Sequence, residues 1–301
     1  MTWTIAPLLT DGALMIDNSS MEYIEKCMRS AQYHNINKRE LDKSRSALEF
    51  GKAFHEILAS RYRDYGNEYL SKEQVVKLYQ QAAATKLSPP DDDYRTSSFL
   101  CDAVLQYCTQ YPAESFEVLL VEQPFAFKLG VITIDGLPVP IIWQGRLDLL
   151  YRSNGRVGIM DHKTTSMMGP QFFSEFAISH QMYGYRRAGN ELLKGTDTVK
   201  EFTINGLGCR QPTKTGKKFE FLRHINPVDE SLATEWETDC LNIVAGFLTC
   251  CRDGYFPKIT TSCVGKYGAC QYHGVCTMPV AVRENVLASN EFRPVTWDPL
   301  Q

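Results

Sequence analysis

The sequence predicts an α/β fold in which a central mixed β-sheet is flanked by helices. Capping-box spacings open several helical segments in the first third of the chain. From residue 116 onward, apolar runs alternate with turn signals, which is typical of strands. The composition, 44% hydrophobic and 22% charged over 301 residues, fits a globular protein and excludes disordered, collagen-like and coiled-coil chains.

Two capping-box spacings predict the first two helices. Ser19 and Glu22 open a helix of about 14 residues that carries Cys27. Ser46 and Glu49 repeat the spacing and open the second helix.

The second helix carries a stripe of residues at helical spacing. Its members are Leu48, Gly51, His55, Leu58 and Tyr62. Such a stripe faces a core, so His55 is expected to point inward rather than to bulk water.

Residues 66–115 are expected to form a helical insertion. Ser71 and Gln74 open its first helix. The run SPPDDD at 88–93 ends that helix, and a helical pattern resumes at 99–111.

The remaining elements alternate strands with helices. Turn signals at Asp135-Gly136 and Asn154-Gly155 separate the strand candidates, which cover 116–127, 131–134, 138–152 and 156–163. A helix at 171–194, a strand pair at 198–204 and 218–225, and a long helix at 227–251 follow. After residue 254 the chain is expected to be irregular.

The hairpin around 154–155 is the most informative segment. Asn-Gly is the strongest short-range signal for a two-residue turn and therefore sets the strand register. In that register Asp148 lies opposite Asp161 and Arg146 lies opposite Lys163, all on one face of the sheet.

Two facing carboxylates destabilise a sheet unless something compensates their repulsion. A divalent cation such as Mg2+ would do so, and it can activate water and stabilise charge on a phosphoryl oxygen. Lys163 is placed to stabilise a transition state, and Gln181 and Tyr185 share one helix face and could hold a phosphate or base. Taken singly, each of these residues is more often a solvated charge or a satisfied core residue.

The sequence contains ten cysteines. Its N-terminal segment lacks the basic region of an export signal, and no run of apolar residues is long enough to span a membrane. A cytoplasmic protein with reduced thiols is therefore expected. Six cysteines fall in predicted helices or strands and are expected to be core residues: Cys101, Cys108, Cys209, Cys240, Cys250 and Cys251. Cys263, Cys270 and Cys276 lie in the irregular segment instead.

Four segments together resemble a known family. GKAFHE at 51–56, GRLD at 145–148, DHKTTS at 161–166 and QMYGY at 181–185 occur in the order and spacing of the PD-(D/E)XK nucleases, specifically the RecB-like exonuclease branch. The resemblance implies a restriction-endonuclease-like fold and a Mg2+- or Mn2+-dependent deoxyribonuclease.

The resemblance also implies roles for individual residues. His55, Asp148 and Asp161 would bind the metal with help from the backbone carbonyl of His162, and Lys163 would be the catalytic lysine. Gln181 and Tyr185 match the family's QxxxY motif, to which catalytic roles are carried over. Glu122, on the preceding strand, is a weaker match to an acidic position.

The chain also resembles the iron-sulfur members of this branch in its cysteine pattern. These members include AddB-type helicase-nuclease subunits and CRISPR-associated RecB-like exonucleases. Their cysteine pattern is matched by Cys27, Cys263, Cys270 and Cys276, although six residues separate Cys263 from Cys270 where the family commonly has two. On chemical grounds four thiolates suit a 4Fe-4S cluster or, as a less favoured occupant, Zn2+; unliganded core thiols remain an alternative.

These expectations define a nuclease domain at 19–276, which includes the insertion at 66–115 and a cysteine segment at 254–276, followed by a tail at 277–301. The expected function is a DNA exonuclease in recombination, repair or phage DNA metabolism, acting on single strands or ends. The alternative is a catalytically silent DNA-binding or assembly module that retains the fold.

The net charge of −3 supplies no general attraction for DNA. One loop is rich in basic residues and carries Arg210, Lys214, Lys217 and Lys218. This loop could contact the DNA backbone, or it could be a solvated hairpin tip. Protein partners are not predicted.

Overall fold

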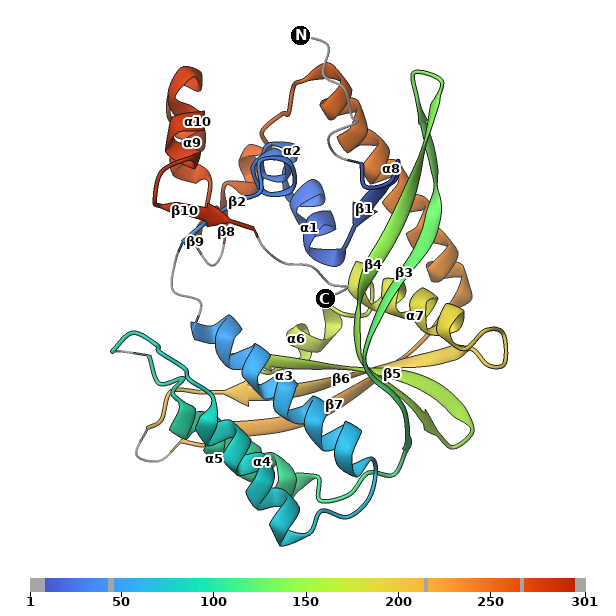
Figure 1. Cartoon of the computed structure of the whole chain (residues 1–301), viewed down its shortest axis with the longest axis vertical. Coiled ribbons are helices and arrows are strands. Elements are labelled where there is room, and N and C mark those ends of the chain that lie inside the picture. Colours follow the sequence, from blue (N-terminus) through green and yellow to red (C-terminus); the bar gives the residue numbers. More distant parts are fainter. Residues whose placement is uncertain (1–8, 43–45, 92, 214–215, 266–267, 296–301) are drawn as a thin grey trace. The chain divides into compact units, whose positions relative to one another are not determined.

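The computed structural model describes residues 9–42, 46–91, 93–213, 216–265 and 268–295 (Figure 1). The chain forms two compact units. Unit 1 consists of residues 1–43, 124–145 and 230–301, and unit 2 consists of residues 44–123 and 146–229. Strands β3 (Glu117–Ile134) and β4 (Leu137–Ser153) pair with each other and contribute residues to both units.

Unit 2 contains the mixed sheet that the sequence predicts. The second part of β4 pairs antiparallel with β5 (Arg156–Thr165). Strand β5 pairs in parallel with β6 (Val199–Cys209), and β6 pairs antiparallel with β7 (Phe219–Pro227). The register pairs Ser153 with Arg156 and Leu149 with Met160, as the Asn-Gly turn predicts.

Helices cover both faces of this sheet. On one face α3 (Ser46–Tyr65), α4 (Lys72–Ala84) and α5 (Ser97–Gln110) pack on strand residues such as Leu149 and Met160 in one hydrophobic core. On the other face lie α6 (Pro170–Ser174) and α7 (His180–Leu192) (Figure 1). Because Gly189 has no side chain, α7 approaches Val199 of β6 and Ile159 of β5 closely.

The helix predictions for unit 2 hold with two corrections. The capping box of Ser71 and Gln74 is formed at the start of α4. Leu48 is 46% exposed, so the predicted inward stripe of α3 begins only at Gly51. The helix predicted at 171–194 is split, because the Ser179 hydroxyl accepts the Gln181 N–H and caps a new helix there.

Unit 1 contains shorter elements around one long helix, α8 (Glu230–Asp253). Strand β1 (Leu14–Ile16) pairs in parallel with the first part of β4, and Trp143 of β4 packs edge-on against Trp236 of α8. The other elements are α1 (Asn18–Lys26), α2 (Met28–Ala31), a π-helical turn (Gln32–Ile36), β2 (Arg39–Leu41), a 3-10 turn (Thr260–Ser262), β8 (Val264–Gly265), β9 (Gly268–Ala269), α9 (His273–Thr277), a second 3-10 turn (Val280–Val282), α10 (Arg283–Leu287) and β10 (Phe292–Pro294).

The first predicted helix begins and ends differently from the expectation. Asp17, rather than Ser19, caps α1, because the Asp17 carboxylate accepts the Ser20 N–H at 2.7 Å. Cys27 lies between α1 and α2 in an extended conformation, so it interrupts the helix that was expected to carry it.

The end of the described chain is tied into unit 1. Strand β10 pairs antiparallel with β2, and a small aromatic core lies beside this pair, with Tyr33 packed edge-on against Tyr272. Among the described residues, no helix is both long enough and apolar enough to cross a membrane.

Candidate active site and cysteine pocket

The two aspartates of the hairpin lie where the β4–β5 ladder ends. The predicted register holds, but the paired residues stop at Leu149 and Met160, one pair before Asp148 and Asp161. The His162 N–H instead donates a hydrogen bond to Oδ2 of Asp148 at 2.8 Å. The expected direct pairing of the two aspartates is therefore replaced by a bond from the β5 backbone to one carboxylate.

His55 and Glu122 join Asp148 at this point. Nδ1 of His55, on α3, lies 3.3 Å from Oδ2 of Asp148. One ligand atom from each of His55, Glu122 and Asp148 lies within 4.8 Å of the others. Glu122 adopts a positive φ of 49° within β3, a conformation that non-glycine residues rarely adopt and that often occurs at functional sites. These three groups could hold one metal ion.

Asp161 and Lys163 form an ion pair beside this group. Nζ of Lys163 lies 2.7 Å from Oδ2 of Asp161. Asp161 is only 1% exposed. Oδ1 of Asp161 is buried and has no hydrogen-bond partner within the described part of the chain. A buried carboxylate oxygen without a partner is costly, and a cation would satisfy it.

Burial dominates the electrostatics of the site. Burial raises the pKa of Asp148 and of Asp161 to about 6, against the opposing effect of Lys163. Burial and the charge of Asp148 raise the pKa of Glu122 to about 7. Burial and the charge of Lys163 lower the pKa of His55 to about 4, so its imidazole is neutral and available as a ligand at neutral pH.

Gln181 and Tyr185 of α7 lie at the same site. Nε2 of Gln181 donates to the Tyr185 hydroxyl at 2.9 Å. Burial, followed by the charges of Asp161 and Asp148, raises the pKa of Tyr185 well above its ordinary value. The Tyr185 hydroxyl therefore stays protonated and can donate a hydrogen bond.

The His162 side chain points away from the carboxylates, into the core under α3, where it stacks on Tyr62. Its N–H points to Asp148, and the N–H and C=O of one strand residue point to the same edge. The His162 carbonyl therefore faces the same edge as its N–H. The structure thus brings together the residues that the sequence singled out in this region, and it adds Glu122, which the sequence indicated only weakly through its place on the strand before the hairpin.

The predicted basic loop lies between β6 and β7. Arg210 and Lys218 are on the surface and form ion pairs, Arg210 with Glu220 at 2.9 Å and Lys218 with Asp102 at 3.3 Å. Lys217 is exposed. Lys214 lies outside the described residues.

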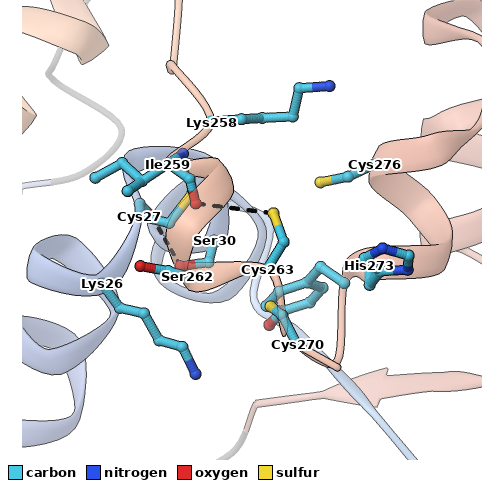
Figure 2. Close-up of a pocket in the computed structure, with 11 residues that line it drawn as sticks. Lys26, Cys27, Ser30, Lys258, Ile259, Ser262, Cys263, Cys270, His273 and Cys276 are labelled. Carbon is cyan, nitrogen blue, oxygen red and sulfur yellow. Dashed lines mark hydrogen bonds between the residues drawn. The ribbon is translucent and has the colours of Figure 1, made fainter. Parts of the chain in front are cut away.

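The four cysteines of the predicted cluster site line one pocket in unit 1 (Figure 2). Cys27 enters from the break between α1 and α2, and Cys276 from α9. Cys263 and Cys270 flank the short β8–β9 hairpin, and the Cys270 N–H donates to the Cys263 carbonyl at 2.8 Å. The hairpin therefore brings these two residues together despite the six residues between them.

Polar and basic residues surround the pocket. The Ile259 N–H donates to Sγ of Cys27 at 3.3 Å, and Lys26 and Lys258 are part of the lining. Of the six cysteines expected to be core residues, five are buried in α5, β6 and α8, and Cys250 is half-buried.

Comparison with protein families identifies the class of protein. The model of the PD-(D/E)XK nuclease superfamily matches residues 18–277, so the chain belongs to this superfamily. No match was found among curated proteins.

Solved structures that are similar to the chain include the following two. A protein from Eubacterium rectale that is provisionally named an exonuclease has 10% sequence identity and a TM-score of 0.47, with 90% of this chain and 92% of that chain covered. LHK-Exo, solved in complex with dAMP, has 14% identity and a TM-score of 0.28, with 67% of this chain and 94% of that chain covered.

Proposed function

We propose that this chain is a Mg2+- or Mn2+-dependent deoxyribonuclease that hydrolyses phosphodiester bonds as an exonuclease. The observation that carries the proposal is the convergence of His55, Glu122 and Asp148 within 4.8 Å, beside the buried and partly unpartnered carboxylate of Asp161. Burying several carboxylates together is unfavourable, and a divalent cation offsets that cost.

The donor set fits a hard divalent cation. Carboxylate oxygens suit Mg2+ and Mn2+, and a neutral imidazole suits transition metals such as Mn2+. His55, Glu122, Asp148 and Asp161 would hold the ion, with the His162 carbonyl available on the same edge. When bound, the ion would activate water and stabilise the charge that develops on the phosphoryl oxygens.

The side chains around the metal site have separate tasks in this proposal. Water attacks phosphorus, and the bond from phosphorus to the leaving sugar oxygen breaks. The Lys163 ammonium, held by Asp161, stabilises the extra negative charge of the transition state. The protonated Tyr185 hydroxyl, oriented by Gln181, can donate a hydrogen bond to a phosphate oxygen.

The alternative, a catalytically silent binding module, is disfavoured by the same geometry. Carboxylates without a cation repel a phosphate backbone, and a module that only binds DNA has no use for several of them together. DNA single strands or ends are the proposed substrate, and recombination, repair or phage DNA metabolism is the proposed setting. The cytoplasm, where thiols stay reduced, is the proposed location.

We also propose that Cys27, Cys263, Cys270 and Cys276 hold a 4Fe-4S cluster. Four cysteines line one pocket, which is the donor set such a cluster requires. Four thiolates also suit a single zinc ion, and analysis of the purified protein for iron, sulfide and zinc distinguishes the two.

The cluster would act as a clamp within unit 1. It would join Cys27, near the start of the chain, to the segment that carries the other three cysteines. A link across so long a stretch of chain restricts the unfolded state strongly.

The nuclease proposal is tested with end-labelled single- and double-stranded DNA, with Mg2+, with Mn2+ and with EDTA. Lys163→Ala should lower kcat by about 100-fold or more, because it removes a group that acts mainly in the transition state. Its Mn2+ affinity, measured by electron paramagnetic resonance, should stay within a few-fold of that of the wild type. Wild-type protein without metal-dependent cleavage, or Lys163→Ala with full activity, would contradict the proposal.

A further inference from the structure

A buried hydrogen-bond network lies in unit 2 on the α3 face of the sheet and includes the residue between Asp161 and Lys163. It joins side chains from α3, α5, β5, β6 and β7 with one residue of the α5–β3 connection: Tyr62, Tyr107, Glu114, His162, Asn205 and Arg223. Burying polar groups is unfavourable unless their hydrogen bonds are made, and here they are made to one another.

Glu114 and Arg223 anchor the network. The guanidinium donates to both Glu114 oxygens, at 2.6 and 2.8 Å, which is the strong bidentate arrangement. A third donor reaches the Tyr107 hydroxyl at 2.9 Å. The guanidinium is therefore held from several sides, with its Nε–H directed at Asn205.

The anchor sets the direction of every bond up to His162. Nε of Arg223 lies 3.2 Å from Oδ1 of Asn205, and a guanidinium can only donate, so this atom of the amide is the oxygen. Nδ2 of Asn205 then donates to Nδ1 of His162 at 2.8 Å and to the Tyr107 hydroxyl at 2.9 Å. Nδ1 of His162 must accept, which makes the imidazole neutral with its proton on Nε2.

His162 contacts two of the candidate metal ligands. Its ring packs edge-on against the His55 ring, with centroids 5.6 Å apart and planes at 89°. Its backbone N–H donates to Asp148 at 2.8 Å. The Tyr62 ring is stacked on the same imidazole, with centroids 5.8 Å apart and planes at 6°. A displaced His162 would therefore disturb both ligands.

We propose that Asn205 is a positioning residue of the metal site, which acts through His162 to hold His55 and Asp148 in place. This inference rests on the proposed metal-dependent function. Residues that orient metal ligands typically contribute a factor of 10 to 100 to metal affinity.

The first test is Mn2+ binding to the full-length protein without DNA, followed by electron paramagnetic resonance. Asn205→Leu keeps the side-chain volume but removes the donors, and it should raise the Mn2+ Kd by about tenfold or more. Thr203→Val is the matched control. Thr203 lies on the same face of β6, and its hydroxyl bonds Tyr151 at 2.7 Å, so this variant loses one buried hydrogen bond without touching His162. Its Kd should stay within twofold of the wild-type value.

A double-mutant cycle shows whether Asn205 acts through His162. His162→Phe keeps an aromatic ring at this position but removes both ring nitrogens, including Nδ1, and it should weaken Mn2+ binding by a similar factor. In the double variant the two losses should not add, because the second substitution removes a bond that the first has already broken. Additive losses, or an Asn205→Leu Kd within twofold of the wild-type value, would overturn the proposal.

Nitrogen-15 NMR of the histidine rings tests the wild-type protein directly, whether or not Asn205→Leu folds. Nδ1 of His162 should be unprotonated and Nε2 protonated; the reverse tautomer would overturn the inferred bond directions and with them the proposal. Wild-type protein that binds no Mn2+ would refute the proposed function as well. Normal wild-type Mn2+ binding that Asn205→Leu leaves unchanged would refute the positioning role alone.

Discussion

Asp161→Asn should stabilise the metal-free protein above neutral pH, although it removes a residue of the candidate active site. Burial raises the pKa of Asp161 from the ordinary 3.8 to about 6 even though Lys163 lies 2.7 Å away. The ionised carboxylate is therefore unfavourable in the folded state relative to its protonated form. Asparagine resembles the protonated acid in shape and carries no charge.

The pKa difference sets the size and the pH dependence of the effect. A difference of about two pKa units corresponds to about 3 kcal/mol. The folded state holds its proton in the window between pH 4 and 6 while the unfolded state releases it, so the wild type loses stability as the pH rises through this window. The advantage of Asp161→Asn should thus be near zero at pH 3, roughly half developed at pH 5 and about 3 kcal/mol at pH 8.

The assay is urea unfolding in EDTA, followed by far-ultraviolet circular dichroism. Tryptophan fluorescence is unsuitable, because the tryptophans in the described part of the chain, Trp143 and Trp236, belong to unit 1, whereas Asp161 belongs to unit 2. Asp102→Asn is the control, since Asp102 is on the surface and pairs only with Lys218 among the described residues; it should change stability by less than about 1 kcal/mol.

Magnesium provides the second half of the test. Mg2+ at about 100 times its Kd should stabilise the wild type by about 2.7 kcal/mol, and Asp161→Asn should lose most of this gain. An Asp161→Asn variant that is less stable than the wild type in EDTA at pH 8, and that Mg2+ still stabilises fully, would refute the reasoning.

Two further predictions concern proton competition and the cysteine pocket. The pKa values of Asp148, Asp161 and Glu122 lie at about 6 to 7, so protons compete with the metal ion at lower pH. The Mn2+ Kd should therefore decrease as the pH rises from 5.5 to 7.5 and become constant by pH 8.5. A Kd that is constant from pH 5.5 upward would contradict these raised pKa values. Wild-type protein purified without oxygen should be brown and contain iron and sulfide. The Cys276→Ser variant should contain neither iron nor sulfide, and its segment after residue 254 should become sensitive to proteases. The control variant Cys250→Ser, whose substitution lies outside the pocket, should retain iron and sulfide. Stoichiometric zinc without iron would exclude the cluster.

Local sequence was sufficient for the hairpin. Its register follows from two adjacent turn residues, and the pairs from Ser153–Arg156 to Leu149–Met160 agree with it. A two-residue turn leaves little freedom to the strands on either side. For the same reason the motif residues Asp148, Asp161 and Lys163 could be placed at one site before any tertiary contact was known.

Glu122 and Asn205 could not be placed in this way. Glu122 reaches the site through the pairing of β3 with β4 and through a left-handed backbone conformation, neither of which has a local signal. Asn205 lies beside His162 only because β5 and β6 pair in parallel, with a crossover that contains α6 and α7.

The sequence thus predicts the residues of the candidate site, but it does not predict their environment. Residue types and hairpin spacing predict the carboxylates and the lysine of the candidate site, and the resemblance to the nuclease family predicts the four cysteines. Tertiary structure decided that Asp161 is buried with one unpartnered oxygen, that His162 turns its ring away from the carboxylates, and that a hairpin brings Cys263 to Cys270. Burial and hydrogen-bond direction depend on contacts between segments far apart in the sequence, and only the folded chain brings those segments together.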